Sequence, residues 1–547
     1  MEIQLSGWIR KYMHEHNRGM AFSLFAIVLI VYLPFLHNPF VFDDLPFFSK
    51  NSANDFAGSF FNFNLRWLSY ASIGWTWAFF IEDTFYFHLG NSLLHALNTV
   101  LLFYLLQQIV LNHIQKKLDI GSATYGAWLG ALVFGAHPVA TYAAGYMIQR
   151  SILMAVMFGL LMQLAYLKAL LGGQKRWLIL SVIAYFFAVF AKEHSVMLPA
   201  AVAAETVLFW PQRRVSIIAL FGTWGAFTIV AILIILRAKG VFGVPYEPMA
   251  AMLFEQRGMK ETSLTLHLLS VITQAGLYFK YLLMWLIPNP ALMSIDMREA
   301  FVASWNQWQA WLDPLMFMLY GAVAVKLLLR RGRPGLAGLA LLYPLLMFLI
   351  EFSTIRVQEP FVLYRSYFWI PGLMLLIPLI VSKFQSKLLY VSAGCIILIL
   401  IGLSWSRLWI LGDNYRLWND AAVLLKTGKE PGADRIYYNR GQSSIESKNW
   451  QEVSEDMQRV YSLNPEIYQA IYWNGIALMN MEKYQEAIVQ FKQATLVKHD
   501  DAQSYYALAI AYKRMHQEME SAYAMRMACE RNHIVACMIV NGMKEKK

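Results

Sequence analysis

Residues 215–236 read VSIIALFGTWGAFTIVAILIIL and contain no charged side chain. A helix of about 20 mostly apolar residues is long enough to cross a bilayer, so this stretch predicts a membrane span. Similar apolar stretches recur over the first three-quarters of the chain. We expect eleven crossings, near residues 20–36, 87–111, 123–136, 150–171, 177–191, 195–210, 215–236, 312–329, 336–352, 367–382 and 387–410.

The composition agrees with a chain that is mostly embedded in lipid. Of its 547 residues, 58% are hydrophobic and 15% are charged, whereas soluble domains carry charge on about a quarter of their residues. The formal net charge is +11. In a membrane protein such an excess of Lys and Arg is explained by basic residues concentrated in the cytoplasmic loops. It gives no reason to expect a nucleic-acid partner.

Orientation follows from the basic loops, because Lys and Arg concentrate on the cytoplasmic side of membrane proteins. If the N-terminus lies in the cytoplasm, five clusters of basic residues all lie on the cytoplasmic side only if the ambiguous apolar stretch 266–287 does not cross the membrane. We therefore expect 237–311 to lie outside, with 266–287 as an interfacial or re-entrant helix, and everything after about residue 411 to lie outside too. The clusters that decide this are Lys116/Lys117, Lys175/Arg176, Arg213/Arg214, Arg330/Arg331/Arg333 and Lys383/Lys387.

The C-terminal region differs in character, because charge rises and a repeat of 34 residues emerges. Aromatic and small residues stay in register at Tyr438, Tyr472, Tyr506, Gly441, Gly475 and Ala509. Thirty-four residues is the period of the tetratricopeptide (TPR) repeat, in which stacked helix pairs bury a shared core. The sequence therefore predicts an all-α chain, with a polytopic membrane domain over 1–410 and an α-solenoid TPR domain over 411–547.

The three cysteines divide between these two domains. Cys395 lies in an apolar run, and we expect it to be a buried small side chain. Cys529 and Cys537 can form a disulfide if their compartment is oxidising. Nothing in their spacing resembles a metal-binding knuckle.

Two adjacent carboxylates, Asp43 and Asp44, follow the first apolar stretch in the sequence PFVFDD at 39–44. Like charges side by side raise the pKa of one of the pair, which suits a general base, and such a pair could also hold a divalent metal. The alternative interpretation is a solvated loop or a helix N-cap.

Further polar residues interrupt the apolar pattern on the same outer side, at Arg66, His137, Arg150, Lys192, Glu193, Tyr364, Arg365 and Tyr367. Charges at membrane depth are costly, so such groups usually line a cavity. The positive-inside rule does not explain outer cations, and a lipid phosphate is the anion they would meet there. Each group could also be part of a structural pair. His88, Asn91 and His95 share one face of the second span, where core hydrogen bonding is the first interpretation and substrate contact the second.

In their order along the chain, these short motifs resemble the GT-C glycosyltransferases. The set is Phe42-Asp43-Asp44, Asn91–Asn98, His137-Pro138-Val139, Arg150, Lys192-Glu193 and Arg365-Ser366-Tyr367. It is similar to the TMTC-type O-mannosyltransferases, whose spans also precede TPRs, and to bacterial pilin glycosyltransferases of the TfpW type. The likeness covers nearly the whole chain.

The resemblance implies a lipid-phosphate-linked sugar donor, an extracytoplasmic active site, and Asp43 as the base, with Asp44 supporting it or binding acceptor or metal. We expect a single displacement with inversion, in which Asp43 takes the proton of a Ser or Thr hydroxyl and cations stabilise the departing phosphate. Beyond the donor no cofactor is expected with certainty, and a divalent metal would belong at the Asp43/Asp44 pair. The candidate donor-phosphate-binding residues are Arg66, His137, Arg150, Lys192, Glu193 and Arg365, and the candidate substrate contacts are His88, Asn91, His95, Tyr364 and Tyr367.

The leading interpretation is a protein O-glycosyltransferase of the bacterial inner membrane that uses a polyprenyl-phosphate sugar. Its periplasmic TPR domain would dock an exported acceptor such as a type IV pilin; in a eukaryote the same faces would meet the lumen of the endoplasmic reticulum. Two alternatives stay open. The acceptor could be lipid A or a polysaccharide, or the chain could be a non-enzymatic scaffold or transporter that recruits partners through its repeats.

Overall fold

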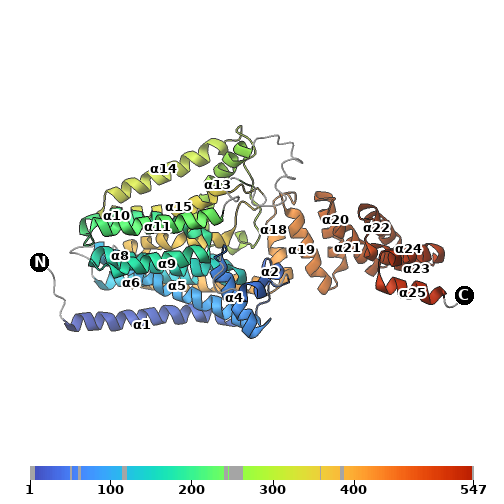
Figure 1. Ribbon diagram of the computed structural model, residues 1–547, viewed down its shortest axis with the longest axis horizontal. Helices are drawn as coiled ribbons and strands as arrows, with labels where there is room; N and C mark the ends of the chain where they lie inside the picture. The colour runs from blue at the N-terminus through green and yellow to red at the C-terminus, as the bar shows by residue number, and fades with distance from the viewer. Residues whose placement is uncertain are drawn as a thin grey trace. The chain divides into compact units, whose positions relative to one another are not determined.

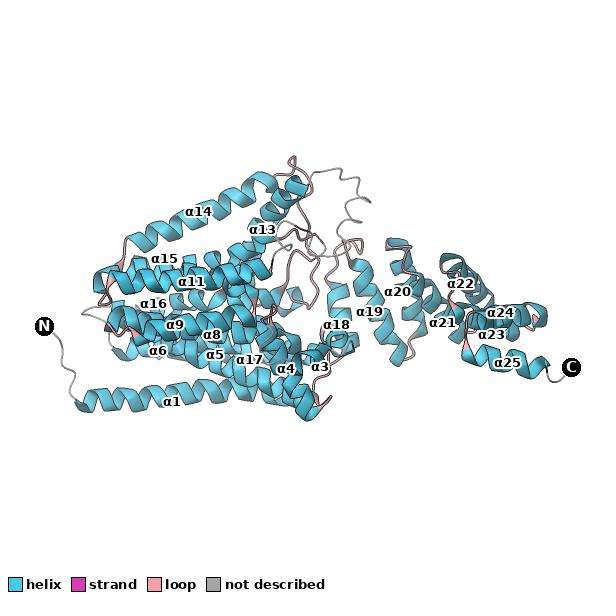
Figure 2. Ribbon diagram, viewed as in Figure 1, coloured by secondary structure: helices cyan, strands magenta, loops and turns pink. Residues whose placement is uncertain are grey.

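The computed structural model describes residues 7–49, 52–58, 63–113, 120–238, 244, 263–357, 359–381 and 387–544. Within these ranges every regular element is a helix and no strand is present, which confirms the all-α prediction there (Figures 1 and 2). The chain divides into two compact units. The first contains Met1–Ile295 and Ala300–Asp413, and the second contains Asp296–Glu299 and Asn414–Lys547.

The first unit is a bundle of long apolar helices. By length and composition, seven helices of the described residues can cross a membrane. They are α1 (Gly7–Tyr32), α5 (Thr84–His113), α8 (Arg150–Gly172), α11 (Ile217–Arg237), α14 (Gln309–Leu329), α15 (Gly332–Phe348) and α17 (Lys387–Leu411). The prediction of a membrane protein is compatible with this arrangement, and seven of the eleven predicted crossings coincide with these helices.

The other predicted crossings fall on shorter helices, namely α6 (Ile120–Ala136), α9 (Arg176–Ala191), α10 (Leu198–Phe209) and α16 (Leu376–Val381) with η9 (Ile370–Leu375). At 12 residues, α10 is about 18 Å long, which is well short of the hydrocarbon core. Pro199 at its first turn and Pro211 just beyond its end restrict the helix on both sides. The prediction of a full crossing over 195–210 is therefore not supported by helix length.

The ambiguous stretch 266–287 forms α13 (Ser263–Leu286), an unbroken helix that is not among the seven. One face of its first half is buried against two loop segments. Leu266, Leu269 and Ile272 pack there with Phe301, Val302, Ile355 and Val357. The helix is thus covered by non-helical chain on at least one side.

Glycine permits close approach at helix crossings in the bundle. A Cβ atom on Gly338 of α15 would lie 2.2 Å from the backbone nitrogen of Leu328 in α14, and one on Gly126 of α6 would lie 2.6 Å from Cα of Pro378. Any larger side chain at these positions would push the backbones apart. Small residues are the usual means of tight helix packing in a bilayer.

Short elements between the long helices carry the polar residues discussed below. They are α2 (Asp44–Ser49), α3 (Ser52–Ala57), α4 (Trp67–Phe80), η2 (Pro138–Ala140), α7 (Thr141–Ala144), η3 (Met147–Gln149), η4 (Glu193–Met197), η7 (Leu349–Ser353) and η8 (Leu363–Phe368). The remaining short helices of this unit are η1 (Leu33–Phe35), η5 (Trp210–Gln212) and η6 (Pro290–Leu292).

The second unit is a stack of short helices, which Figure 1 shows in succession from orange to red. They are α18 (Asn414–Val423), α19 (Ala433–Glu446), α20 (Trp450–Leu463), α21 (Tyr468–Asn480), α22 (Tyr484–Val497), α23 (Ala502–Arg514), α24 (Glu518–Glu530) and α25 (Ile534–Lys544). The alternate helices α20, α22 and α24 begin 34 residues apart, at Trp450, Tyr484 and Glu518. A Cβ atom on Gly475 would lie 2.5 Å from the Phe491 ring, so the small residue of the repeat permits contact within a helix pair.

The second unit is discontinuous in sequence, because it includes the four residues Asp296–Glu299. Asp296 is buried and accepts hydrogen bonds from Arg298 Nη2 and Arg435 Nη2, each at 2.7 Å. Arg298 also donates to the carbonyl oxygen of Pro431 at 3.4 Å. A carboxylate shared by two guanidinium groups thus holds the short segment against α19.

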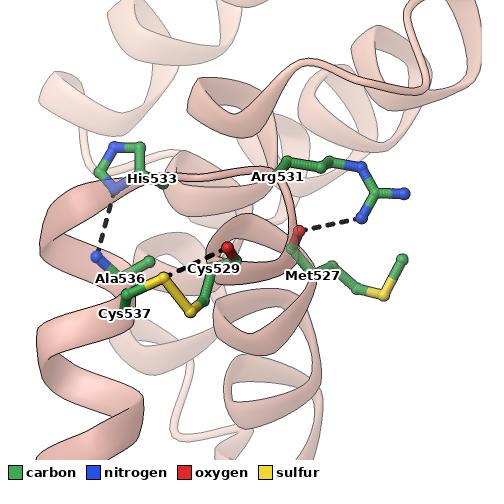
Figure 3. The surroundings of a disulfide bond; sticks show 6 residues. All are labelled: Met527, Cys529, Arg531, His533, Ala536 and Cys537. Atoms are coloured by element: carbon green, nitrogen blue, oxygen red, sulfur yellow. Dashed lines mark hydrogen bonds between the residues drawn. A yellow bond between two sulfur atoms is a disulfide. The ribbon is translucent and has the colours of Figure 1, made fainter.

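Two of the three cysteines form a disulfide and the third is free. Cys529 and Cys537 form a disulfide between α24 and α25, with their Cα atoms 4.5 Å apart (Figure 3). Beside it the Ala536 N–H donates to His533 Nδ1 at 3.2 Å, where α25 begins. The prediction for Cys395 is wrong, because this residue is exposed on α17 together with Ile396 and Leu398. An apolar run marks an apolar environment, and on this face of α17 that environment is the outside of the bundle.

Candidate functional site

A cavity of about 220 Å³ in the first unit gathers charged side chains from five separate parts of the chain. It is lined by Asp43, Arg66, Tyr70, Ile148, Gln149, Ser151, Lys192, His194, Tyr364, Arg356 and Arg365. Of the residues that the sequence singles out as site candidates, the structure brings Asp43, Arg66, Lys192, Tyr364 and Arg365 together here. A carboxylate and four basic side chains therefore line one cavity.

The two neighbouring aspartates have different surroundings. Asp43 is exposed, lines the cavity, and donates its backbone N–H to Tyr146 Oη at 2.9 Å. Asp44 is only 1% exposed and accepts hydrogen bonds from the backbone N–H groups of Ile148 at 2.8 Å and Val41 at 3.2 Å. Burial raises the pKa of Asp44 to about 7, since the lost hydration outweighs these two donors. Asp44 holds the loop in place, while Asp43 faces the cavity.

Arg66 and Glu193 form a two-pronged ion pair. Arg66 Nε donates to Glu193 Oε2 at 2.8 Å, and Arg66 Nη2 contacts the other carboxylate oxygen. Burial pushes the pKa of Glu193 up, but the adjoining guanidinium outweighs it and holds that pKa well below its ordinary value. The sequence prediction of Glu193 as a phosphate ligand needs correction, because an ionised carboxylate repels an anion. Glu193 instead orients the Arg66 guanidinium through this ion pair.

Lys192 is buried between two elements that both contribute to the cavity. Its Nζ donates to Gln149 Oε1 at 3.3 Å and to Ser151 Oγ at 3.5 Å, and lies 5.5 Å from the centre of the Tyr364 ring. Burial lowers the pKa of Lys192 to about 7, and the nearby Arg66 and Arg365 act in the same direction. Its ammonium charge is therefore sensitive to conditions near neutral pH.

Glu351 lies behind the cavity and was not singled out by the sequence. It is 1% exposed, accepts a hydrogen bond from Arg365 Nη1 at 2.9 Å, and lies 3.1 Å from Arg356 Nε. Its other oxygen is 3.4 Å from His194 Nε2. The available signal was an acidic residue inside the apolar stretch 336–352, because a lone carboxylate at that depth needs cationic partners.

Two predicted phosphate ligands lie elsewhere. Arg150 is buried beneath the site and donates to Asn91 Oδ1 at 2.9 Å, Thr76 Oγ1 at 2.9 Å and the Phe87 carbonyl at 3.0 Å. His137 is buried, stacks on the Trp285 ring at 4.3 Å, and accepts the Val139 N–H through Nδ1. Burial lowers the pKa of His137 to about 3, so this ring is neutral. Neither side chain lines the cavity, and we withdraw both as phosphate ligands.

The polar residues of α5 and Tyr367 serve the interior of the bundle. His95 lies 2.8 Å from Tyr367 Oη and 3.0 Å from the Gly135 carbonyl. Asn91 donates to the Tyr146 and Met147 carbonyls, and His88 lies 3.0 Å from the Asn38 carbonyl. All four side chains are buried and none lines the cavity. Core hydrogen bonding, the first interpretation of the α5 residues, describes their contacts.

A second, smaller pocket of about 60 Å³ adjoins the polar cavity and shares His194 and Arg356 with it. Its remaining wall is mainly apolar, with Val196, Ile234, Ile235, Ala238 and Ile350 among the lining residues. Ile235 is partly exposed on the outside of α11. An anionic group with an apolar tail would find cations in one space and aliphatic side chains in the next.

The cavity therefore contains a candidate proton acceptor, several cations for an anion, and an apolar neighbour. Among the described residues, no group of three or more His, Cys, Asp or Glu side chains could hold a metal ion. Each oxygen of Asp44 accepts one backbone N–H group, which ties this carboxylate to the chain. No protein-family model matches the sequence, and no curated protein matches it either.

Proposed function

We propose that this protein is a membrane glycosyltransferase of the GT-C type that transfers a sugar from a polyprenyl-phosphate carrier to a Ser or Thr hydroxyl of an exported protein. The site faces the periplasm of a bacterium, and the N-terminus lies in the cytoplasm. The observation that carries the proposal is the shared cavity of Asp43, Arg66, Lys192 and Arg365.

The cations account for the phosphate of the donor. Guanidinium groups match the geometry of phosphate oxygens, and Arg66, Arg356 and Arg365 all line the cavity. Glu193 and Glu351 balance part of the positive charge of these arginines, and a bound phosphate would balance the rest, since unbalanced charge at that depth is costly. A lipid phosphate is the anion available at a membrane surface.

The adjoining apolar pocket accounts for the lipid. It shares His194 and Arg356 with the polar cavity, and isoleucines of α11 and η7 form part of its wall. The headgroup would lie among the cations, while the first isoprene units would lie against Ile234 and Ile350. A soluble phosphate ester would have no use for such a wall.

The chemistry then follows from Asp43. An acceptor hydroxyl is a weak nucleophile until Asp43 removes its proton as attack proceeds. A new bond forms between that oxygen and the anomeric carbon, and the bond from the anomeric carbon to the phosphate oxygen breaks. The electron pair stays on the phosphate, where Arg365 and Lys192 stabilise it. A single displacement of this kind inverts the anomeric carbon.

In this proposal the second unit binds the acceptor protein. We interpret its helix pairs as TPRs, and they enclose a groove of about 350 Å³. The groove has aromatic walls at Tyr472, Tyr484 and Tyr506 and a cation at Arg514. Such a surface suits an extended peptide with apolar side chains and a carboxylate, which is why a protein acceptor is preferred to lipid A or a polysaccharide.

The test compares Asp43→Asn with Asp55→Asn in the purified full chain in lipid nanodiscs. Asp55 is an exposed acid of the neighbouring helix α3 and does not line the cavity. A panel of polyprenyl-monophosphate sugars and Ser/Thr peptides is supplied, and glycosylated peptide and released polyprenyl phosphate are measured by mass spectrometry. Asp43→Asn should bind polyprenyl phosphate without transfer, whereas Asp55→Asn should match the wild type.

Sugar transfer by Asp43→Asn at the wild-type rate would show that Asp43 is not the general base. A folded wild-type chain that neither binds polyprenyl phosphate nor transfers sugar would favour the scaffold or transporter interpretation instead. Transfer to lipid A but not to any peptide would retain the chemistry and exclude the protein acceptor.

A further inference from the structure

Glu351 is the junction of the charged network around the cavity. One of its oxygens accepts Arg365 Nη1 at 2.9 Å and lies 3.1 Å from Arg356 Nε, while the other lies 3.4 Å from His194 Nε2. Three cavity-lining side chains from three separate segments thus converge on one buried carboxylate.

The network continues from Glu351 to the opposite wall. His194 lies between Glu351 and Glu193, with its Nδ1 at 3.6 Å from Glu193 Oε1. Glu193 in turn holds Arg66 by the two-pronged contact described above. Two carboxylates, with an imidazole 3.4 and 3.6 Å from them, therefore contact the three arginines that line the cavity.

Glu351, Arg356 and Arg365 are all buried, which restricts the conformations of their side chains. A long guanidinium side chain in water samples many rotamers, and fixing it costs conformational entropy that folding can supply in advance. Groups that are already held where charge develops need no reorganisation during the reaction. Glu351, which is 1% exposed and lies outside the cavity wall, is placed to orient two cations without meeting the substrate.

We propose that Glu351 is a positioning residue, which aims Arg365 and Arg356 at the phosphate that leaves during sugar transfer. The inference rests on the proposed function of the cavity. Glu351 neither touches the donor nor transfers a proton. It acts through the two arginines, and mainly through Arg365, whose contact is the shorter.

The experiment is a double-mutant cycle on the purified full chain, with Glu351→Gln, Arg365→Gln and the combination. Glutamine keeps the size of the side chain and removes its charge. Misplacement of a stabilising group can cost on the order of 10²-fold, so Glu351→Gln should lower kcat and kcat/KM equally by about that factor. Because Glu351 acts mainly through Arg365, adding Glu351→Gln to Arg365→Gln should cause a much smaller loss than it causes in the wild type.

The control is Glu205→Gln. Glu205 is another buried glutamate of the first unit, 1% exposed on α10, and does not line the cavity. Its variant should keep the wild-type kcat even if the thermal stability changes. Should Glu351→Gln fail to fold, Glu351→Asp replaces it, since aspartate keeps the charge but withdraws it by one methylene. The loss in kcat that Glu351→Asp causes should then be much smaller in the Arg365→Gln background.

Strictly additive losses in the cycle, or a Glu351→Gln variant with reduced thermal stability but wild-type kcat, would overturn the positioning role while leaving the glycosyltransferase proposal intact. A folded wild-type chain without transfer on the full donor panel would overturn both proposals. The wild-type measurement therefore separates the two.

Discussion

The carboxylate of Asp44 accepts the Ile148 backbone N–H at 2.8 Å, a contact between residues 104 positions apart. It joins the loop after α1 to the segment that begins α8, and Ile148 itself lines the cavity. The position of Asp43 is therefore set by its neighbour, which binds backbone and leaves the cavity to Asp43.

Replacing Asp44 by Ala should destabilise the first unit and slow transfer together. Each buried N–H left without a partner costs about 1–3 kcal/mol, and the change affects the N–H groups of Val41 and Ile148. Thermal unfolding in detergent and the transfer rate per folded protein measure the two effects. Asp55→Ala is the matched control, and an unchanged melting temperature for Asp44→Ala would contradict the assigned role.

The pH dependence of donor use should follow Lys192. Because burial lowers its pKa to about 7, the ammonium form that binds phosphate is present below that pH and is lost above it. The donor kcat/KM should therefore fall as the pH rises through about 7. Lys192→Arg keeps its charge throughout and should remove the decline. A wild-type profile that stays flat across neutral pH would exclude Lys192 as a phosphate ligand.

Two arginines that the sequence predicts as phosphate ligands should give opposite results. Arg66 lines the cavity, so Arg66→Gln should reduce kcat/KM by roughly 10²-fold or more while the protein remains folded. The donor groups of Arg150 bind the protein interior, so Arg150→Gln should lower the melting temperature and leave the rate per folded molecule near the wild type. Rates and melting curves on the same samples test this, and equal effects of both variants would refute the distinction.

The Cys529–Cys537 disulfide predicts the compartment of the second unit. Such bonds persist in the periplasm and are rare in the cytosol. Alkylation of intact cells, followed by mass spectrometry of the C-terminal peptides, should find both thiols blocked until a reductant is added. Both thiols labelled without reduction would place the unit in a reducing compartment. Cys529→Ser with Cys537→Ser should destabilise the unit by about 2–4 kcal/mol.

The fold was largely predictable because long apolar runs have few other interpretations. The exceptions have physical causes: α10 is restricted by Pro199 and Pro211, and Cys395 faces outward because an apolar sequence fits lipid as well as a protein core. The sequence thus indicates which segments enter the membrane region more reliably than it indicates which of them cross completely.

The site was predictable where charge conflicts with location. Asp43, Arg66, Lys192 and Arg365 are costly residues in an apolar unit, and the cavity brings them together. Arg150 has the same signal, yet its partners are carbonyls and amides that no sequence pattern reveals. Glu351 was missed because it lies within an apolar stretch, although the same cost of burial applies to it.

The four residues Asp296–Glu299 determine which fragment of the chain contains the whole second unit. A fragment that starts at Asn414 has all of its helices, but it deprives Arg435 of the carboxylate that it contacts at 2.7 Å. Truncation at that point would also remove Arg298, which donates to the Pro431 carbonyl just before α19 at 3.4 Å. Binding studies on an isolated repeat unit should therefore supply residues 296–299, by fusion or as an added peptide.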